Sequence, residues 1–170
     1  MKQLLQQYAA YNLWANKKII SHIIQLSEEQ INKEIVSSFP SLYKTVMHMM
    51  EVENVWWERL KLAEHTTPSG WFTGNFEELS KKLLQLSQQW VQWVSSANEA
   101  NINHVFGYQN TKKEQFKQPV YEVLLHLFNH QTYHRGQVVT LLRQSGMDKI
   151  SGTDFILFSR NPPSSSKGEF

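Results

Sequence analysis

Four segments of the 170-residue chain repeat their apolar side chains with the period of an α-helix, and this repetition constrains the fold more than any other feature of the sequence. Their approximate bounds are residues 2–26, 42–63, 76–96 and 119–145. Ser41 is suited to start the second segment, Pro119 opens the fourth, and Gly146 is suited to end it. Four long helices predict an all-α four-helix bundle, a fold that places metal and cofactor sites among the side chains of facing helices.

The connection between the third and fourth helices has a different pattern. Residues 104–118 place Val105 and aromatic side chains on either side of a turn centred on Asn110, which predicts a short β-hairpin. After the last helix, the apolar stretch TDFILFSR is expected to pack on the bundle as an extended arm. We therefore predict a single domain over residues 1–160 and a mobile tail over residues 161–170, where the sequence is polar and rich in serine and proline.

Composition excludes several classes of partner and site. The formal net charge is +2 and the lysines are dispersed. The sequence has no basic stripe of the kind that binds nucleic acid, so we expect no nucleic-acid partner. The sequence has no run of 18 apolar residues, so we expect no membrane span. Polar residues interrupt the first twenty positions, so we expect a cytoplasmic protein without an export signal. Cysteine is absent, which excludes disulfides and cysteine-ligated metal.

Three histidines stand at four-residue intervals in the fourth helix: His126, His130 and His134. His130 and His134 fall within its inward apolar stripe, between Leu127 and Val138. Buried imidazole nitrogens need partners. Because side chains four residues apart on a helix are neighbours, these two rings are able to bind one ion.

A pair of histidines does not saturate zinc or nickel, and His48 is the best candidate for a third ligand because it lies mid-helix beside an apolar stripe that includes Val52. Three protein nitrogens would leave one coordination position open, as in catalytic rather than structural sites. The alternative is a set of core histidines with satisfied hydrogen bonds. Each of the histidines His126, His130 and His134 is rotated by about 40° around the helix axis relative to the one before it. We therefore expect His126 outside the ligand set, behind a ligand or in the pocket wall.

Several motifs resemble those of the DinB/YfiT-like family. They are YNLWAN in the first helix, MHMMEVENVWW in the second, NHQTYHRGQ in the last and GTDFILFSR near the end, so the resemblance covers about residues 1–160. It implies a four-helix bundle of up-down-down-up topology that usually forms a homodimer and holds a divalent metal ion with three histidines. At the motif positions these ligands are His48, His130 and His134.

The resemblance also includes the two residues that follow His134. Arg135 and Gly136 complete the signature of the last helix. We interpret Arg135 as an outward or interhelical ion-pair residue, and Gly136 as a position that allows close approach of another helix.

Characterised relatives include thiol S-transferases that use bacillithiol or mycothiol, a maleylpyruvate isomerase that uses mycothiol, and metal-dependent hydrolases. Many members have no established activity. We expect a metal-dependent enzyme and favour a bacillithiol-type S-transferase. In such an enzyme a zinc ion, or alternatively nickel, lowers the pKa of a small thiol cosubstrate, which then attacks an electrophile. Two alternatives stay open: a hydrolase with a metal-activated water, and a non-enzymatic bundle that binds metal or a small ligand. The sequence identifies no catalytic residue beyond the ligands.

Overall fold

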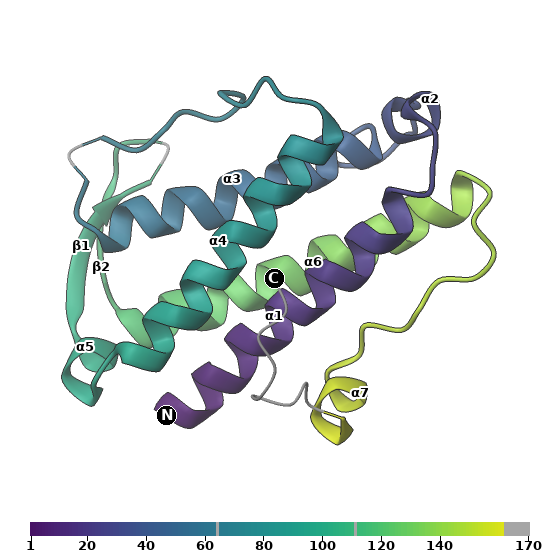
Figure 1. The fold of residues 1–170 in the computed structure, drawn as a ribbon. Helices are drawn as coiled ribbons and strands as arrows, with labels where there is room; N and C mark the ends of the chain where they lie inside the picture. Colours follow the sequence, from purple (N-terminus) through teal and green to yellow (C-terminus); the bar gives the residue numbers. More distant parts are fainter. Residues whose placement is uncertain (64, 111, 162–170) are drawn as a thin grey trace.

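A computed structural model describes residues 1–63, 65–110 and 112–161 and places four long helices side by side (Figure 1). The long helices are α1 (Lys2–Ile23), α3 (Leu42–Leu60), α4 (Phe76–Ser96) and α6 (Val120–Gln144). The short elements are α2 (Glu28–Asn32), α5 (Glu99–Asn103), β1 (Val105–Gln109), β2 (Gln115–Pro119) and α7 (Phe155–Arg160).

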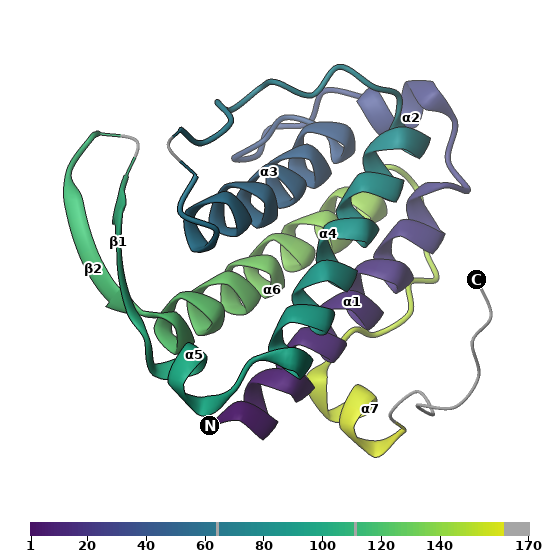
Figure 2. The same cartoon turned by 60° about the vertical axis from the view of Figure 1, so that its left-hand side comes forward.

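The long helices have the predicted up-down-down-up topology. Helices α1 and α6 run in one direction, and α3 and α4 run in the other (Figures 1 and 2). Each of α1 and α3 packs against both α4 and α6. Because α3 and α4 run the same way, the connection between them leads back along the length of the bundle (Figures 1 and 2), and its residues 66–69 form one wall of a pocket.

Local signals explain where the helices begin and end. The Ser41 side chain accepts a hydrogen bond from the backbone N–H of Lys44, and Asn75 forms a reciprocal capping box with Glu78. Helix α3 ends at Leu60, three residues earlier than predicted. Its continuation is broken at Leu62, whose φ of 54° is left-handed.

The core has two apolar clusters separated by a polar layer. One cluster includes Ile23, Met49 and Leu142, and the other includes Trp90 and Leu124. Between them along all four long helices lie buried polar side chains, which are Asn12, Asn16, Glu53, Ser87 and Arg135. A buried polar layer has to be satisfied internally, so it constrains how the helices pack.

The hairpin prediction is confirmed, and the prediction of an extended arm is wrong. Strands β1 and β2 pair antiparallel, with Tyr108 opposite Phe116. The arm forms α7 because one helical turn brings Phe155 and Phe158 onto the same face. There Phe155 stacks on Tyr8 with ring centroids 4.9 Å apart.

The predicted mobile tail lies outside the described residues except for Asn161. Within the described part of the chain, no helix is long and apolar enough to cross a membrane.

Candidate metal centre

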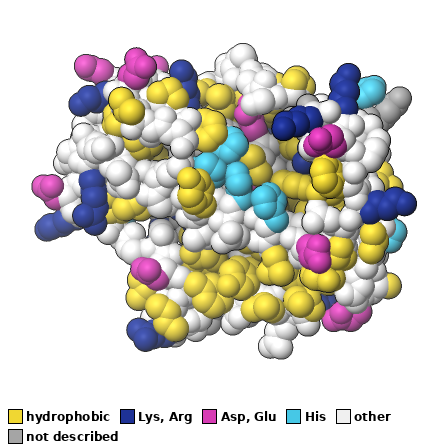
Figure 3. Space-filling model, turned by 180° about the vertical axis from the view of Figure 1, so that it is seen from behind, with side chains coloured by type: hydrophobic (Ala, Val, Ile, Leu, Met, Phe, Trp, Pro, Cys, Tyr) yellow, Lys and Arg dark blue, Asp and Glu magenta, His cyan; other side chains and the backbone are white. Residues whose placement is uncertain are grey.

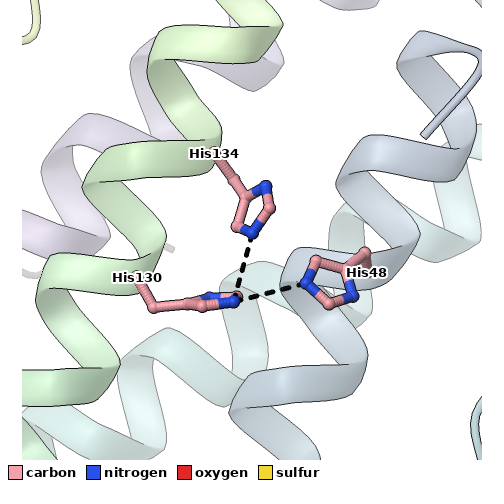
Figure 4. A group of neighbouring side chains, drawn as sticks. All are labelled: His48, His130 and His134. Carbon is pink, nitrogen blue, oxygen red and sulfur yellow. Dashed lines mark hydrogen bonds between the residues drawn. The ribbon is translucent and has the colours of Figure 1, made fainter. Parts of the chain in front are cut away.

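His48 on α3 and His130 and His134 on α6 converge between these two helices (Figure 4). The Nε2 atom of His130 lies 3.3 Å from Nε2 of His48 and 3.1 Å from Nε2 of His134. The i, i+4 spacing of α6 explains the second contact, and the packing of α6 against α3 produces the first. The structure therefore brings together the three histidines that the sequence singled out.

Hydrogen bonding alone does not satisfy this arrangement. A ring nitrogen carries either one proton or one lone pair in the ring plane, so Nε2 of His130 is unable to make two good hydrogen bonds at once. A tetrahedral ion at about 2.0–2.1 Å from each nitrogen would separate the nitrogens by about 3.3 Å. The two separations of 3.1 and 3.3 Å thus fit ligands of one ion.

The electrostatic surroundings keep the three rings neutral. Burial, with the neighbouring His134 ring as a smaller cause, lowers the pKa of His48 to about 4. Burial and the adjacent histidines likewise lower the pKa of His130 to about 4. The pKa of His134 is also lowered by burial, although its hydrogen bond to Gln137 opposes the change. Neutral imidazole is the form that binds metal.

One glutamine side chain orients His134, and another links the two helices that carry the cluster. Nδ1 of His134 lies 2.7 Å from Oε1 of Gln137, an acceptor, so the ring proton is on Nδ1 and the Nε2 lone pair is free. Nε2 of Gln131 donates to the backbone carbonyl of Met49 at 2.8 Å and ties α6 to α3 beside the site. Gln131 was not predicted from the sequence, although a polar residue within the inward apolar stripe of the last helix indicates an internal hydrogen bond.

Phe39 covers one side of the histidine cluster. Its ring stacks on His48 with centroids 4.1 Å apart and meets His134 edge-on at 5.6 Å. Phe39 precedes α3 in an irregular segment, so no periodic pattern indicated its position. The contact excludes water from that side of the site.

His126 lies outside the cluster of three histidines. Its ring centroid is 5.8 Å from that of His130, and it packs edge-on against Trp56 at 5.6 Å. Partial burial and the nearby charge of Arg59 lower its pKa. His126 belongs to the surroundings of the site, whereas the cluster with ligand spacing comprises His48, His130 and His134.

Of the two roles predicted for Arg135, the outward one is wrong: Arg135 is buried and links helices, because it reaches Glu53 on α3 through two asparagines of α1. The residue is 1% exposed, and its guanidinium donates to Oδ1 of Asn12 at 2.7 Å and to Oδ1 of Asn16 at 3.0 Å. The two asparagine amides donate in turn to the Glu53 carboxylate at 2.8 and 3.3 Å. The network begins one residue after His134 and so fixes the buried side of α6 behind the histidines.

Glu53 is the acidic centre of this network. Ser87 also donates to its carboxylate at 3.0 Å, yet burial raises the pKa of Glu53 to about 7.

Gly136 differs from its predicted role, because a Cβ there would meet no atom within 4 Å. Its position is exposed, so it does not provide close contact with another helix in the bundle.

The histidine cluster is accessible from one face of the molecule. Figure 3 shows histidine side chains reaching the surface in the middle of this face, next to hydrophobic side chains. His48 also lines a pocket of about 310 Å³ between α3 and the connection that follows it. A small molecule is therefore able to approach the cluster from this side.

These features define a four-helix bundle with a three-histidine cluster that could hold a metal ion. The DinB family model matches residues 1–161, and the chain belongs to the DinB family. It is 31% identical over 157 residues to Protein DinB of Bacillus subtilis (strain 168), covering 87% of this chain and 89% of that protein.

A solved structure has the same fold. The crystal structure of a DinB-like protein from Bacillus cereus ATCC 10987 matches 81% of this chain and 89% of its own, with a TM-score of 0.62 and 19% identity. At this level of identity the likeness shows the fold alone.

Proposed function

We propose that this protein is a metal-dependent enzyme that transfers a small thiol of the bacillithiol type to an electrophile. One observation carries the proposal: three neutral imidazole nitrogens from two helices converge beside a pocket. Three protein ligands would leave a position for an incoming ligand, the arrangement of catalytic zinc sites. Imidazole ligands suit zinc, and nickel is the alternative.

A divalent ion bound there would lower the pKa of an incoming thiol or water. The chain's own residues would supply the rest of the site. His48, His130 and His134 hold the ion, Gln137 keeps the His134 lone pair directed at it, and Phe39 shields one side. Because the chain has no cysteine, the sulfur must arrive with a cosubstrate.

The pocket favours the transferase over a hydrolase. A hydrolase of this kind would use a nearby carboxylate as the general base for water. Glu51 is the one carboxylate among the described residues that line the pocket. Both of its oxygens already accept hydrogen bonds, from the backbone N–H of Gly70 at 2.6 Å and from Ser69 Oγ at 3.0 Å. A thiol, with a pKa of about 8.5 against about 15.7 for water before either binds a metal, needs no such base to lose its proton at the ion.

The resemblance to dimeric relatives supports a homodimer, which we include in the proposal together with a cytoplasmic location. Neither is needed for the chemistry, because all three candidate ligands come from one chain.

The test is thiol-dependent conjugation of monochlorobimane by zinc-loaded protein whose metal content is measured by elemental analysis. In the reaction the thiol loses its proton, a sulfur–carbon bond forms and chloride leaves. Bacillithiol and cysteine are compared as thiols, with His134→Ala as the inactive control. Stoichiometric metal without turnover with any thiol would favour the non-enzymatic bundle, and thiol-independent ester cleavage would favour the hydrolase.

A further inference from the structure

The pocket beside His48 continues along α3 to Arg59. Its walls include Val52, Val55 and Trp56 on the helix, and residues 66–69 on the opposite side. Its volume of about 310 Å³ is at the lower end of the range for small-molecule sites.

Helix geometry places both ends of the pocket on one line. Eleven residues separate His48 from Arg59, close to three whole turns, so the two side chains project from nearly the same side of α3. The separation along the axis is about 16 Å. Because helical side chains lean towards the N-terminus, the guanidinium lies closer to the histidines, at roughly 10–15 Å.

Arg59 is held in place without an ionic partner among the described residues. Its guanidinium lies over the rings of Trp56 and Tyr108, 4.6 and 5.2 Å from their centroids. Its Nε is buried and has no hydrogen-bond partner in the described part of the chain. A half-buried guanidinium oriented by two aromatic faces retains donors suited to a carboxylate.

The nearby carboxylates are used elsewhere. Glu51 accepts hydrogen bonds from Ser69 and Gly70, and Glu58 accepts from the backbone N–H of Thr67 at 2.7 Å and from its hydroxyl. These bonds fasten the connection after α3 over the pocket. The two acids therefore shape the pocket wall, while Arg59 keeps unused donors.

We propose that Arg59 recognises a carboxylate on the small molecule whose reactive atom lies at the three histidines. The inference rests on the proposed function for the identity of that reactive end, and on the pocket and Arg59 for the anionic end. The carboxylate belongs either to the thiol or to the electrophile. In both cases it is separated from the reacting atom by roughly 10–15 Å along the pocket.

The experiment uses ligands that differ only in the end group. Binding of 8-mercaptooctanoate, 8-mercaptooctanol and octanoate is measured by calorimetry, with zinc-loaded and with chelator-treated protein. The proteins are wild type, Arg59→Met, Arg59→Lys and the exposed control Arg143→Met. Thermal melting checks that each variant is folded, and Arg59→Lys keeps the charge and the long side chain if Arg59→Met does not fold.

We expect zinc-loaded wild type to bind 8-mercaptooctanoate about tenfold or more tightly than 8-mercaptooctanol, because charge-assisted hydrogen bonds are strong. Arg59→Met should remove this preference without changing binding of the alcohol. Arg59→Lys should retain part of it, and Arg143→Met all of it. The shorter 3-mercaptopropionate should bind independently of Arg59.

Two further outcomes separate this inference from the proposed function. If zinc does not strengthen binding of the thiols but octanoate still binds wild type more tightly than Arg59→Met, the proposed thiol chemistry is rejected and the carboxylate site at Arg59 is retained. If octanoate shows that preference and the two thiols bind equally, the carboxylate belongs to the electrophile. The inference is overturned if neither 8-mercaptooctanoate nor octanoate binds wild type more tightly than a folded Arg59→Met protein.

Discussion

The side-chain amide of Gln131 donates a hydrogen bond to the backbone carbonyl of Met49 at 2.8 Å, and each of these residues directly follows a histidine of the cluster. The bond fixes the height of α6 relative to α3 where His130 faces His48. A displacement of one helix along the other would separate nitrogens that now lie 3.3 Å apart.

Replacing Gln131 with methionine should weaken both folding and metal binding. The loss of one buried hydrogen bond should lower the free energy of unfolding by about 1 kcal/mol. Loss of the helix alignment should reduce zinc affinity by about 10–100-fold, as for other groups that orient ligands. Urea unfolding and competition with a zinc indicator measure the two effects. Exposed Gln144→Met is the control on the same helix, and equal zinc affinity in both variants would contradict the role of Gln131.

His130→Ala and His134→Ala should lose zinc and activity while remaining folded. Each removes one of three candidate ligands, but the apolar contacts of Leu127 and Val138 that hold α6 in the core are kept. Metal content after gel filtration and the circular dichroism spectrum provide the measurements. His126→Ala is the matched control and should retain zinc, with at most about 10–100-fold lower affinity. Wild-type zinc content in both ligand variants would refute the assignment.

The melting temperature of chelator-treated protein should be highest near pH 6.5. In the unfolded chain the histidines have a pKa of about 6.5, whereas in the folded protein the pKa of His48 and His130 is lowered to about 4. The two neutral rings therefore contribute to the stability of the fold above pH 6.5, and this contribution is lost as the pH falls from 6.5 to 4. Glu53 acts in the opposite sense. Because burial raises the pKa of Glu53 from 4.5 to about 7, this group contributes stability that is fully present below pH 4.5 and is lost as the pH rises through about 7.

Zinc should change this profile at neutral pH and above. An ion that binds the native state only contributes stability, and protons compete for the same nitrogens. Scanning fluorimetry with and without EDTA should therefore show a large difference at pH 7, and this difference should shrink as the pH falls through about 4, where folded His48 and His130 take up protons. Reloaded protein whose melting is insensitive to EDTA at pH 7 would rule out a metal at His48, His130 and His134.

Arg135→Gln should destabilise the protein by about 3–5 kcal/mol, because it leaves the Asn12 and Asn16 carbonyls without donors and the buried Glu53 without its positive charge. The loss should grow as the pH rises, since the positive charge that lowers the pKa of Glu53 is gone. Chemical unfolding at pH 6 and pH 8 measures it. Exposed Arg143→Gln should change stability by no more than about 0.5 kcal/mol. A similar small effect of Arg135→Gln would show that the network is dispensable.

Periodicity was sufficient to predict the four long helices and the pair of neighbouring histidines on the last one. The contact between His130 and His134 follows from helical spacing, which is a property of the local backbone. The hairpin was also predictable, because turn residues and flanking alternation are local. Spacing alone left the metal site and satisfied core histidines as competing explanations. The preference for His48 also depended on its apolar helix face and on a family resemblance.

Packing between distant segments decided the remaining features. His48 meets His130 only because α3 and α6 are neighbours, and Phe39 covers them only because the segment before α3 folds back. The same packing makes Arg135 a buried residue rather than an outward one and leaves Gly136 in open space.

The sequence by itself therefore determined which helix faces are apolar and which histidines share a face, since both depend on periods of a few residues. Only the tertiary structure decided that Arg59 borders the same pocket as His48, because the pocket is closed by a connection whose hydrogen bonds to Glu51 and Glu58 span 9 to 19 positions. Contacts of that range depend on how the helices pack, and no local pattern in the chain encodes them.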